Sequence, residues 1–226
     1  MINHVSKPIM ERFSVNKFVE TGILQGDTLM ICQDWFVEWF GPKFNTGPWG
    51  AGTPGPARMY EIDFNSAVIA NTNHMKAQKN VNIVVEQAES TAWLKKAIEG
   101  GEFTSTDSVF FYLDAHDDSS LPEAYEGGAP VEHSPKRQPL REEISEILKL
   151  NNKPIISIDD WRIPGGYPDV YYLDMIRDLI RDRTNVIFYS QYWNLHGKFS
   201  AFVFIDRREE ELKEALKGLP LIMQRV

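Results

Sequence analysis

The chain alternates short apolar runs with longer segments of helical periodicity, and this alternation restricts the fold more than any other feature. Each of five apolar runs precedes a helical pattern, and the runs are largely continuous rather than apolar at every second residue. Strands of this kind are typical of parallel sheets covered by helices on both faces. The five predicted strand and helix pairs are 17–21 with 26–40, 59–64 with 66–78, 81–87 with 90–101, 108–116 with 139–150, and 153–160 with 169–183.

The last part of the chain follows a different pattern. Two apolar runs, 185–193 and 198–206, are separated by only four residues, which indicates a hairpin. Residues 208–219 then have the composition of an exposed helix. We therefore predict a three-layer α/β sandwich with a mostly parallel sheet and one antiparallel strand from the hairpin.

The length of 226 residues is enough for one α/β domain and short for two. We predict a single domain over 1–226 that carries two long loops. In 41–58, nine of the eighteen residues are Gly or Pro, which is typical of an inserted loop. The polar segment 117–138 is the second loop, and we expect both loops to act as lids over a ligand.

The charge balance and the single cysteine restrict the possible partners and compartment. The 24 Lys and Arg residues against 32 Asp and Glu residues give a net charge of −8, which disfavours a nucleic-acid partner. Cys32 alone cannot form an internal disulfide. The first ten residues lack the apolar centre of a signal peptide, and no run approaches the ~18 apolar residues of a membrane span. We expect a cytoplasmic protein away from the membrane, and the sequence leaves a homo-oligomer open.

Ligands of open α/β sheets bind beyond the carboxyl ends of the strands. Polar residues follow five of the predicted strands of this chain, so the alternation places five polar groups on one edge of the sheet. The five groups are Glu20–Gly26, Glu61–Asp63, Gln87–Ser90, Asp114–Asp118 and Asp159–Arg162.

The first group contains a strand-to-helix turn with Gly22 and Gly26. Glycine lets a ligand approach the backbone closely and leaves the amides of the next helix accessible, with Asp27 or Thr28 as its cap. A plain turn that merely needs glycine is an equal alternative. Because residue 24 is Leu, the turn is not the G-x-G-x-x-G of dinucleotide sites.

An acid at the end of the second strand commonly binds ribose hydroxyls, about 20 residues after the glycines. Glu61 follows Gly22 by 39 residues (61 − 22), and the excess matches the length of 41–58. We therefore predict that Glu61 binds ribose, with Asp63 as the nearby alternative. Either residue could equally be a solvated strand end.

Asp114, Asp159 and Asp160 end two strands that we expect to lie close together. Carboxylates gathered in one cleft repel each other, and Mg²⁺ with its oxygen ligands is the best counter-charge. The sequence lacks the Cys and paired His ligands of zinc. Asp159 or Asp160 could instead cap the next helix or pair with Arg162. His116 is a candidate general base, or simply a polar loop residue.

Six segments together resemble the class I S-adenosylmethionine-dependent methyltransferases: FVETGILQGDT, MYEIDFN, VEQAESTAWL, FYLDAHDD, PLREEISEIL and PIISIDDWR. The resemblance covers about 17–206 and is closest to the Mg²⁺-dependent O-methyltransferases of catechols and macrolide-type sugars. It implies a Rossmann-like, seven-stranded sheet whose last strand is antiparallel. This chain has fewer glycines in its turn, a longer 41–58 segment, and Asp117 where the catechol enzymes have their lysine base.

The resemblance also implies roles for individual residues. The glycine turn would hold the methionine end of S-adenosylmethionine, the second strand its ribose and the third its adenine. The catalytic residues would be His116 and Asp114, and the metal ligands Asp114, Asp159 and Asp160. The implied cofactor-binding residues are Glu20, Thr21, Gly22, Gly26, Asp27, Thr28, Glu61, Asp63, Glu89, Ser90 and Asp114.

The predicted reaction is Mg²⁺-assisted O-methylation of a hydroxyl on a small molecule or sugar. The metal would lower the pKa of the hydroxyl, His116 or a metal-bound water would take its proton, and the oxygen would attack the methyl group in line. Lid side chains would face the acceptor: Phe44, Trp49, Tyr125 and His133. The alternatives are a metal-independent N- or carboxyl-methyltransferase, a non-catalytic cofactor-binding module and a nucleotide-sugar enzyme.

Overall fold

The structure is a computed structural model that describes residues 2, 4–23, 26–41, 44, 57–75, 82–114, 139–161, 170–183, 186–190 and 199–224. Helices and strands alternate over most of this chain, as the sequence predicts. The helices are α1 (Ser6–Arg12), α2 (Asp27–Phe40), α4 (Ser66–Met75), α5 (Ser90–Glu99), α6 (Leu140–Ile147), α7 (Val170–Ile180) and α8 (Glu209–Ala215). The strands are β1 (Lys17–Thr21), β2 (Arg58–Asp63), β3 (Ile83–Gln87), β4 (Val109–Leu113), β5 (Ile155–Trp161), β6 (Val186–Ser190), β7 (Phe199–Phe204) and β8 (Leu221–Gln224).

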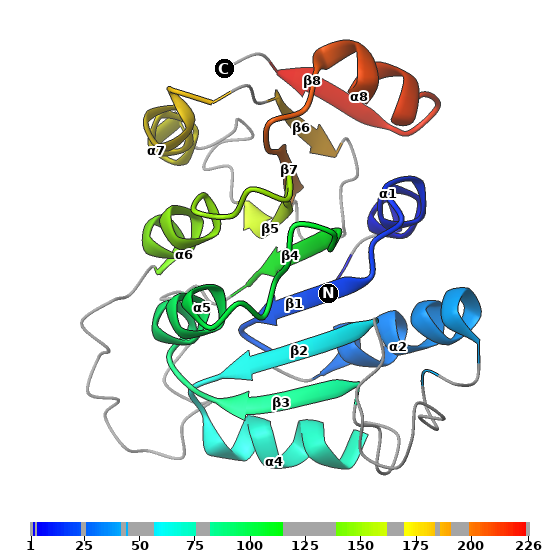
Figure 1. Ribbon diagram of the computed structural model, residues 1–226, viewed down its shortest axis with the longest axis vertical. Coiled ribbons are helices and arrows are strands. Elements are labelled where there is room, and N and C mark those ends of the chain that lie inside the picture. The colour runs from blue at the N-terminus through cyan, green and yellow to red at the C-terminus, as the bar shows by residue number, and fades with distance from the viewer. Residues whose placement is uncertain are drawn as a thin grey trace.

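The described strands form one sheet of eight, in the order β3-β2-β1-β4-β5-β7-β6-β8 (Figure 1). Strands β1 to β5 pair in parallel with one another, and β7 lies antiparallel between β5 and β6. The order is that of a doubly wound sheet, 3-2-1-4-5-6, with an antiparallel strand inserted before the last position. This arrangement confirms the predicted α/β sandwich and its antiparallel hairpin strand.

Two hydrophobic cores lie on opposite faces of the sheet. Helices α5, α6 and α7 cover one face, through side chains such as Leu94, Ile144 and Ile176. Helices α1, α2 and α8 contribute to the other core, where Phe36 and Leu212 are fully buried. Alternation along the strands sends successive side chains to these two cores, which explains why both faces of the central strands are apolar.

The structure adds two elements that the sequence patterns did not indicate. Helix α1 has only seven residues, and strand β8 has four. Strand β8 pairs with β6 and makes the sheet one strand wider than the predicted seven. Helix α1 is shorter than the roughly 11-residue window in which helical periodicity becomes recognisable, and β8 is at the lower limit of about four residues for a strand pattern.

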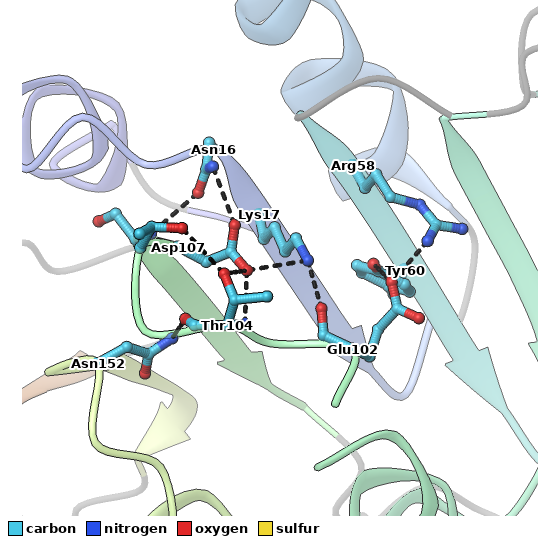
Figure 2. Close-up of polar contacts among 10 residues, drawn as sticks. Asn16, Lys17, Arg58, Tyr60, Glu102, Thr104, Asp107 and Asn152 are labelled. Atoms are coloured by element: carbon cyan, nitrogen blue, oxygen red, sulfur yellow. Dashed lines mark hydrogen bonds and ion pairs between the residues drawn. The ribbon is translucent and has the colours of Figure 1, made fainter. Parts of the chain in front are cut away.

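A polar network joins strands β1 and β2 to the loop before β4 at the amino-terminal edge of the sheet (Figure 2). The Lys17 ammonium lies 3.1 Å from Asp107 Oδ2 and also donates to the Glu102 carbonyl. The Glu102 carboxylate accepts hydrogen bonds from Arg58, at 2.5 Å, and from the Tyr60 hydroxyl. Because ligands of such sheets bind at the opposite edge, this network is structural.

None of the described helices is both long and apolar enough to cross a membrane.

Candidate active site

The turn after β1 is tied to both neighbouring strands at the carboxyl edge. Gly22 N–H donates to the Ile62 carbonyl at 2.9 Å, and Ile23 N–H donates to Asp63 Oδ2 at 3.0 Å. On the other side, Asp114 N–H donates to the carbonyl of the last β1 residue at 2.9 Å. The glycine turn therefore has a fixed position between the ends of β2 and β4.

The backbone of this turn needs its two glycines. Gly22 and Gly26 have φ angles of 80° and 78°, in the left-handed region that favours glycine. Gly26 precedes α2, and no described side chain caps the first turn of that helix. Asp27 is exposed in the first turn, whereas Thr28 is buried. This arrangement fits the predicted binding of a polar ligand at the helix amino terminus.

Glu20 and Glu61 form a buried acid pair on neighbouring strands. They are register partners of β1 and β2, with exposed fractions of 1% and 0%. Glu20 Oε2 and both carboxylate oxygens of Glu61 accept no hydrogen bond from the described residues. Burial raises the pKa of Glu61 to about 7. Burial first, and then the Glu61 charge, raises the pKa of Glu20 well above its ordinary value, while a hydrogen bond from Thr28 lowers it.

The two candidate ribose ligands have different surroundings. Glu61 is enclosed beside Glu20, whereas Asp63 lies at the end of β2 and accepts hydrogen bonds from the backbone N–H groups of Ile23 and Asn65. Phe64, which follows Asp63, is 68% exposed. Sequence reasoning missed this aromatic side chain, because a Phe after an apolar strand is indistinguishable from a core residue. Its exposure at the carboxyl edge of the sheet is visible only in the structure.

Asp159 is held by hydrogen bonds from two neighbouring strands. The Tyr112 hydroxyl on β4 donates to Asp159 Oδ2, and the Ser200 hydroxyl on β7 donates to Asp159 Oδ1 at 3.1 Å. Asp159 itself is 8% exposed. Each carboxylate oxygen therefore already accepts one hydrogen bond, which orients the group.

Strand β5 also contains a register shift at this point. Ile158 pairs with Ala201, but Trp161 pairs with Phe199, so Asp159 and Asp160 together lie opposite the single residue Ser200. A β-bulge of this kind redirects side chains and occurs often near active sites. The side chain of Asp160 lies outside the described part of the structure.

The structure brings Asp114 and Asp159 to the ends of paired strands. Strands β4 and β5 are in register up to Leu113 and Ile158, so the two acids follow neighbouring positions. Alternation places both on the face of Tyr112, and after burial itself their charges raise the pKa of that hydroxyl. Within the described ranges, no group of three or more Asp, Glu, His or Cys residues could hold a metal ion.

Neither a protein-family model nor a curated protein matches the sequence. The structure, however, is similar to an O-methyltransferase from Bacillus cereus solved with S-adenosylhomocysteine, with a TM-score of 0.58 and 13% identity over 92% of this chain and 83% of that one. It is also similar to the O-methyltransferase TomG from Streptomyces achromogenes, solved with S-adenosylmethionine. That match has a TM-score of 0.52 and 12% identity over 90% of this chain and 79% of TomG. The fold is that of the class I S-adenosylmethionine-dependent methyltransferases.

The fold does not test the roles predicted for several individual residues. Glu89 caps α5 by accepting hydrogen bonds from Thr91 and Ala92 N–H, and the adjacent Ser90 is buried. Their predicted contact with adenine remains untested. His116, Trp49, most of 41–58 and all of 117–138 lie outside the described residues.

One lid residue has a different role from the predicted one. Phe44 is fully buried, its ring centroid is 5.2 Å from that of Phe36 on α2, and its carbonyl accepts a hydrogen bond from Asn82 at 2.7 Å. It belongs to the core and not to a surface that faces an acceptor. The sequence did not indicate that Phe44 is a core residue, because a single aromatic residue within the Gly- and Pro-rich segment 41–58 has no periodic pattern around it.

Proposed function

We propose that the protein is an S-adenosylmethionine-dependent methyltransferase that acts on a hydroxyl of a small molecule or sugar, assisted by Mg²⁺. The observation that supports this proposal most is the fixed carboxyl edge. There the glycine turn is hydrogen-bonded to the ends of β2 and β4, Asp63 and Asp114 flank it, and Asp159 lies on the next strand, β5. The methyltransferase fold makes this edge the expected cofactor site.

The cofactor would lie across the ends of β1, β2 and β3. Gly22 and Gly26 would let its methionine end approach the backbone. Asp63 would accept hydrogen bonds from the ribose hydroxyls, because Glu61 is enclosed beside Glu20. The exposed ring of Phe64 offers an apolar surface for the adenine, next to the predicted contacts at Glu89 and Ser90. Bound S-adenosylmethionine supplies an electrophilic methyl group.

Asp114 and Asp159 offer oxygen ligands for a hard cation from neighbouring strands, and Asp160 would be the third ligand. A cation held there would lower the pKa of the acceptor hydroxyl. The hydrogen bonds from Tyr112 and Ser200 would hold Asp159 in one orientation. His116 is the proposed base for the hydroxyl proton.

The first experiment measures cofactor binding and methyl transfer separately. We expect S-adenosylhomocysteine to bind at roughly micromolar concentrations in titration calorimetry, and the Asp63→Asn variant to bind more weakly. Methyl transfer from labelled S-adenosylmethionine to a panel of phenols, sugars and amines, with Mg²⁺ or EDTA, then tests the acceptor and the metal. Asp114→Asn should abolish the response to Mg²⁺, whereas the exposed Asp182→Asn control should keep it. Absence of cofactor binding would refute the proposal as a whole.

One observation favours a metal-independent methyltransferase as the second candidate. Both carboxylate oxygens of Asp159 are already hydrogen-bonded, so this side chain has a sufficient structural role without a metal. In that case, EDTA leaves transfer to an amine or carboxylate acceptor unchanged, and Asp159→Asn retains activity. Transfer to a hydroxyl that requires Mg²⁺ excludes this candidate.

A further inference from the structure

Glu20 and Glu61 form a pair of buried carboxyl groups of a kind that is rare in sheet interiors. Two carboxyl groups face each other from adjacent strands, both are enclosed, and three of their four oxygens accept no hydrogen bond from the described residues. Two ionised carboxylates so close together would repel each other strongly in a medium of low dielectric constant. The pair is therefore stable only while at least one of the two carboxyl groups is protonated and neutral.

The groups that face the pair are mostly neutral. Helix α2 contributes the Thr28 hydroxyl, which hydrogen-bonds to Glu20, and the Cys32 thiol, whose pKa is raised by burial and by both glutamates. Strand β4 contributes Tyr112, whose pKa is raised mainly by burial. The positive charge at the amino terminus of the chain lowers the pKa of Glu20, but this is the smallest of the effects on that pKa. No Lys, Arg or His among the described residues forms an ion pair with either glutamate.

The pair lies next to the turn that would hold the charged end of the cofactor. Glu20 precedes Gly22 by two residues on β1, and Glu61 precedes Asp63 by two residues on β2. The hydrogen bonds from Gly22 to Ile62 and from Ile23 to Asp63 fasten this turn to the strand ends just beyond the pair. Because the distance is short, a change in the charge of the pair changes the electrostatic energy of a charged ligand bound at the turn.

We propose that the Glu20–Glu61 pair makes the site prefer the cationic methyl donor to its neutral-sulfur product, and that this preference is linked to one proton. The inference rests on the proposed function. S-adenosylmethionine and S-adenosylhomocysteine differ only in the methyl group and in the positive charge on sulfur. The pair thus distinguishes S-adenosylmethionine from the S-adenosylhomocysteine that remains after methyl transfer.

The link follows from charge and proton balance. A cation near the pair favours ionisation of Glu61, so binding of the donor releases the Glu61 proton to solvent while Glu20 keeps its own, and binding of the product releases none. As the pH rises through about 7, where Glu61 ionises, the pair gains one negative charge. One added charge at roughly 10 Å and an effective dielectric constant of about 20 changes the affinity for a cation by on the order of tenfold.

Titration calorimetry of both ligands, without an acceptor, tests the inference. We expect the ratio of the product Kd to the donor Kd to rise by roughly tenfold between about pH 6 and about pH 8.5. In the Glu61→Gln variant, which lacks the group that ionises near neutral pH, the ratio should stay constant. If the substitution also removes contacts that both ligands make, both Kd values change by the same factor and their ratio does not change. Glu99→Gln removes an exposed carboxylate from α5 and is the matched control, in which the ratio should still rise.

A second measurement on the unaltered protein does not depend on the folding of a variant. Titrations near pH 7 in buffers of different ionisation enthalpy count the protons released. The donor should release a fraction of a proton, and the product should release none. Equal proton release, or a ratio that does not vary with pH, would overturn this inference alone. Failure of both ligands to bind would overturn the proposed function and the inference together.

Discussion

At the scale of single residues, the most consequential structural contact is the ion pair between Lys17 and Asp107. Their side chains are only 9% and 10% exposed, and their charged atoms lie 3.1 Å apart. Burial alone would raise the pKa of Asp107, but hydrogen bonds from Thr104 and the interactions with Lys17 outweigh it and lower the pKa. The pair therefore stabilises the fold above the ordinary pKa of an aspartate, and this contribution is lost as the pH falls through the lowered value.

Asp107→Asn should destabilise the protein by about 3 kcal/mol, because it leaves the buried Lys17 charge without its partner. The free energy of unfolding in urea at neutral pH measures the effect. The exposed pair of Lys149 and Glu146, at 2.5 Å, provides the control. Lys149→Gln should change stability by less than about 1 kcal/mol. If the two substitutions lowered the free energy of unfolding equally, the ion pair of Lys17 would stabilise the protein no more than a surface ion pair does.

At the scale of elements, strand β5 shows how the sheet orients the candidate metal ligands. Tyr112→Phe and Ser200→Ala each remove one donor to Asp159, and each should cost about 1–2 kcal/mol. They should also raise the Mg²⁺ concentration for half-maximal activity severalfold, while the affinity for S-adenosylhomocysteine stays unchanged. Ser157→Ala is the control, because this buried hydroxyl on the same strand has no hydrogen-bond partner among the described residues. An unchanged Mg²⁺ response in both variants would argue that Asp159 serves only the fold.

Elements also show how far sequence reasoning reaches. The first strand was predicted at its observed bounds, 17–21, because the apolar Phe18 and Val19 lead directly into a glycine turn at Gly22. The bulge at Asp159 was not predictable, because it exists only relative to its partner strand β7. For the same reason, the sequence indicated Glu20 and Glu61 as separate acids, and only the pairing of β1 with β2 showed that they face each other.

At the scale of the whole molecule, the buried acid pair should make global stability depend on pH near neutrality. The folded state keeps the pair protonated up to about pH 7, where Glu61 ionises, whereas a glutamate in the unfolded chain ionises near its ordinary pKa of about 4.3. The unfolded state therefore binds fewer protons between these two values. The stabilising effect of the Glu61 proton is complete below the unfolded pKa and is lost as the pH rises toward 7.

Glu61→Gln should therefore stabilise the protein by about 2 kcal/mol near pH 8 and change its stability little near pH 4.5. A neutral amide needs no proton in the folded state, so the variant avoids the cost that the native pair carries at higher pH. Urea unfolding of the native protein, Glu61→Gln and the exposed Glu99→Gln control at the two pH values measures this difference. If Glu61→Gln were equally destabilising at both values, the carboxyl group would be held by contacts that the amide cannot make. In that case the protonation of Glu61 would not change on folding, and the pH-dependent cost proposed for the pair would be absent.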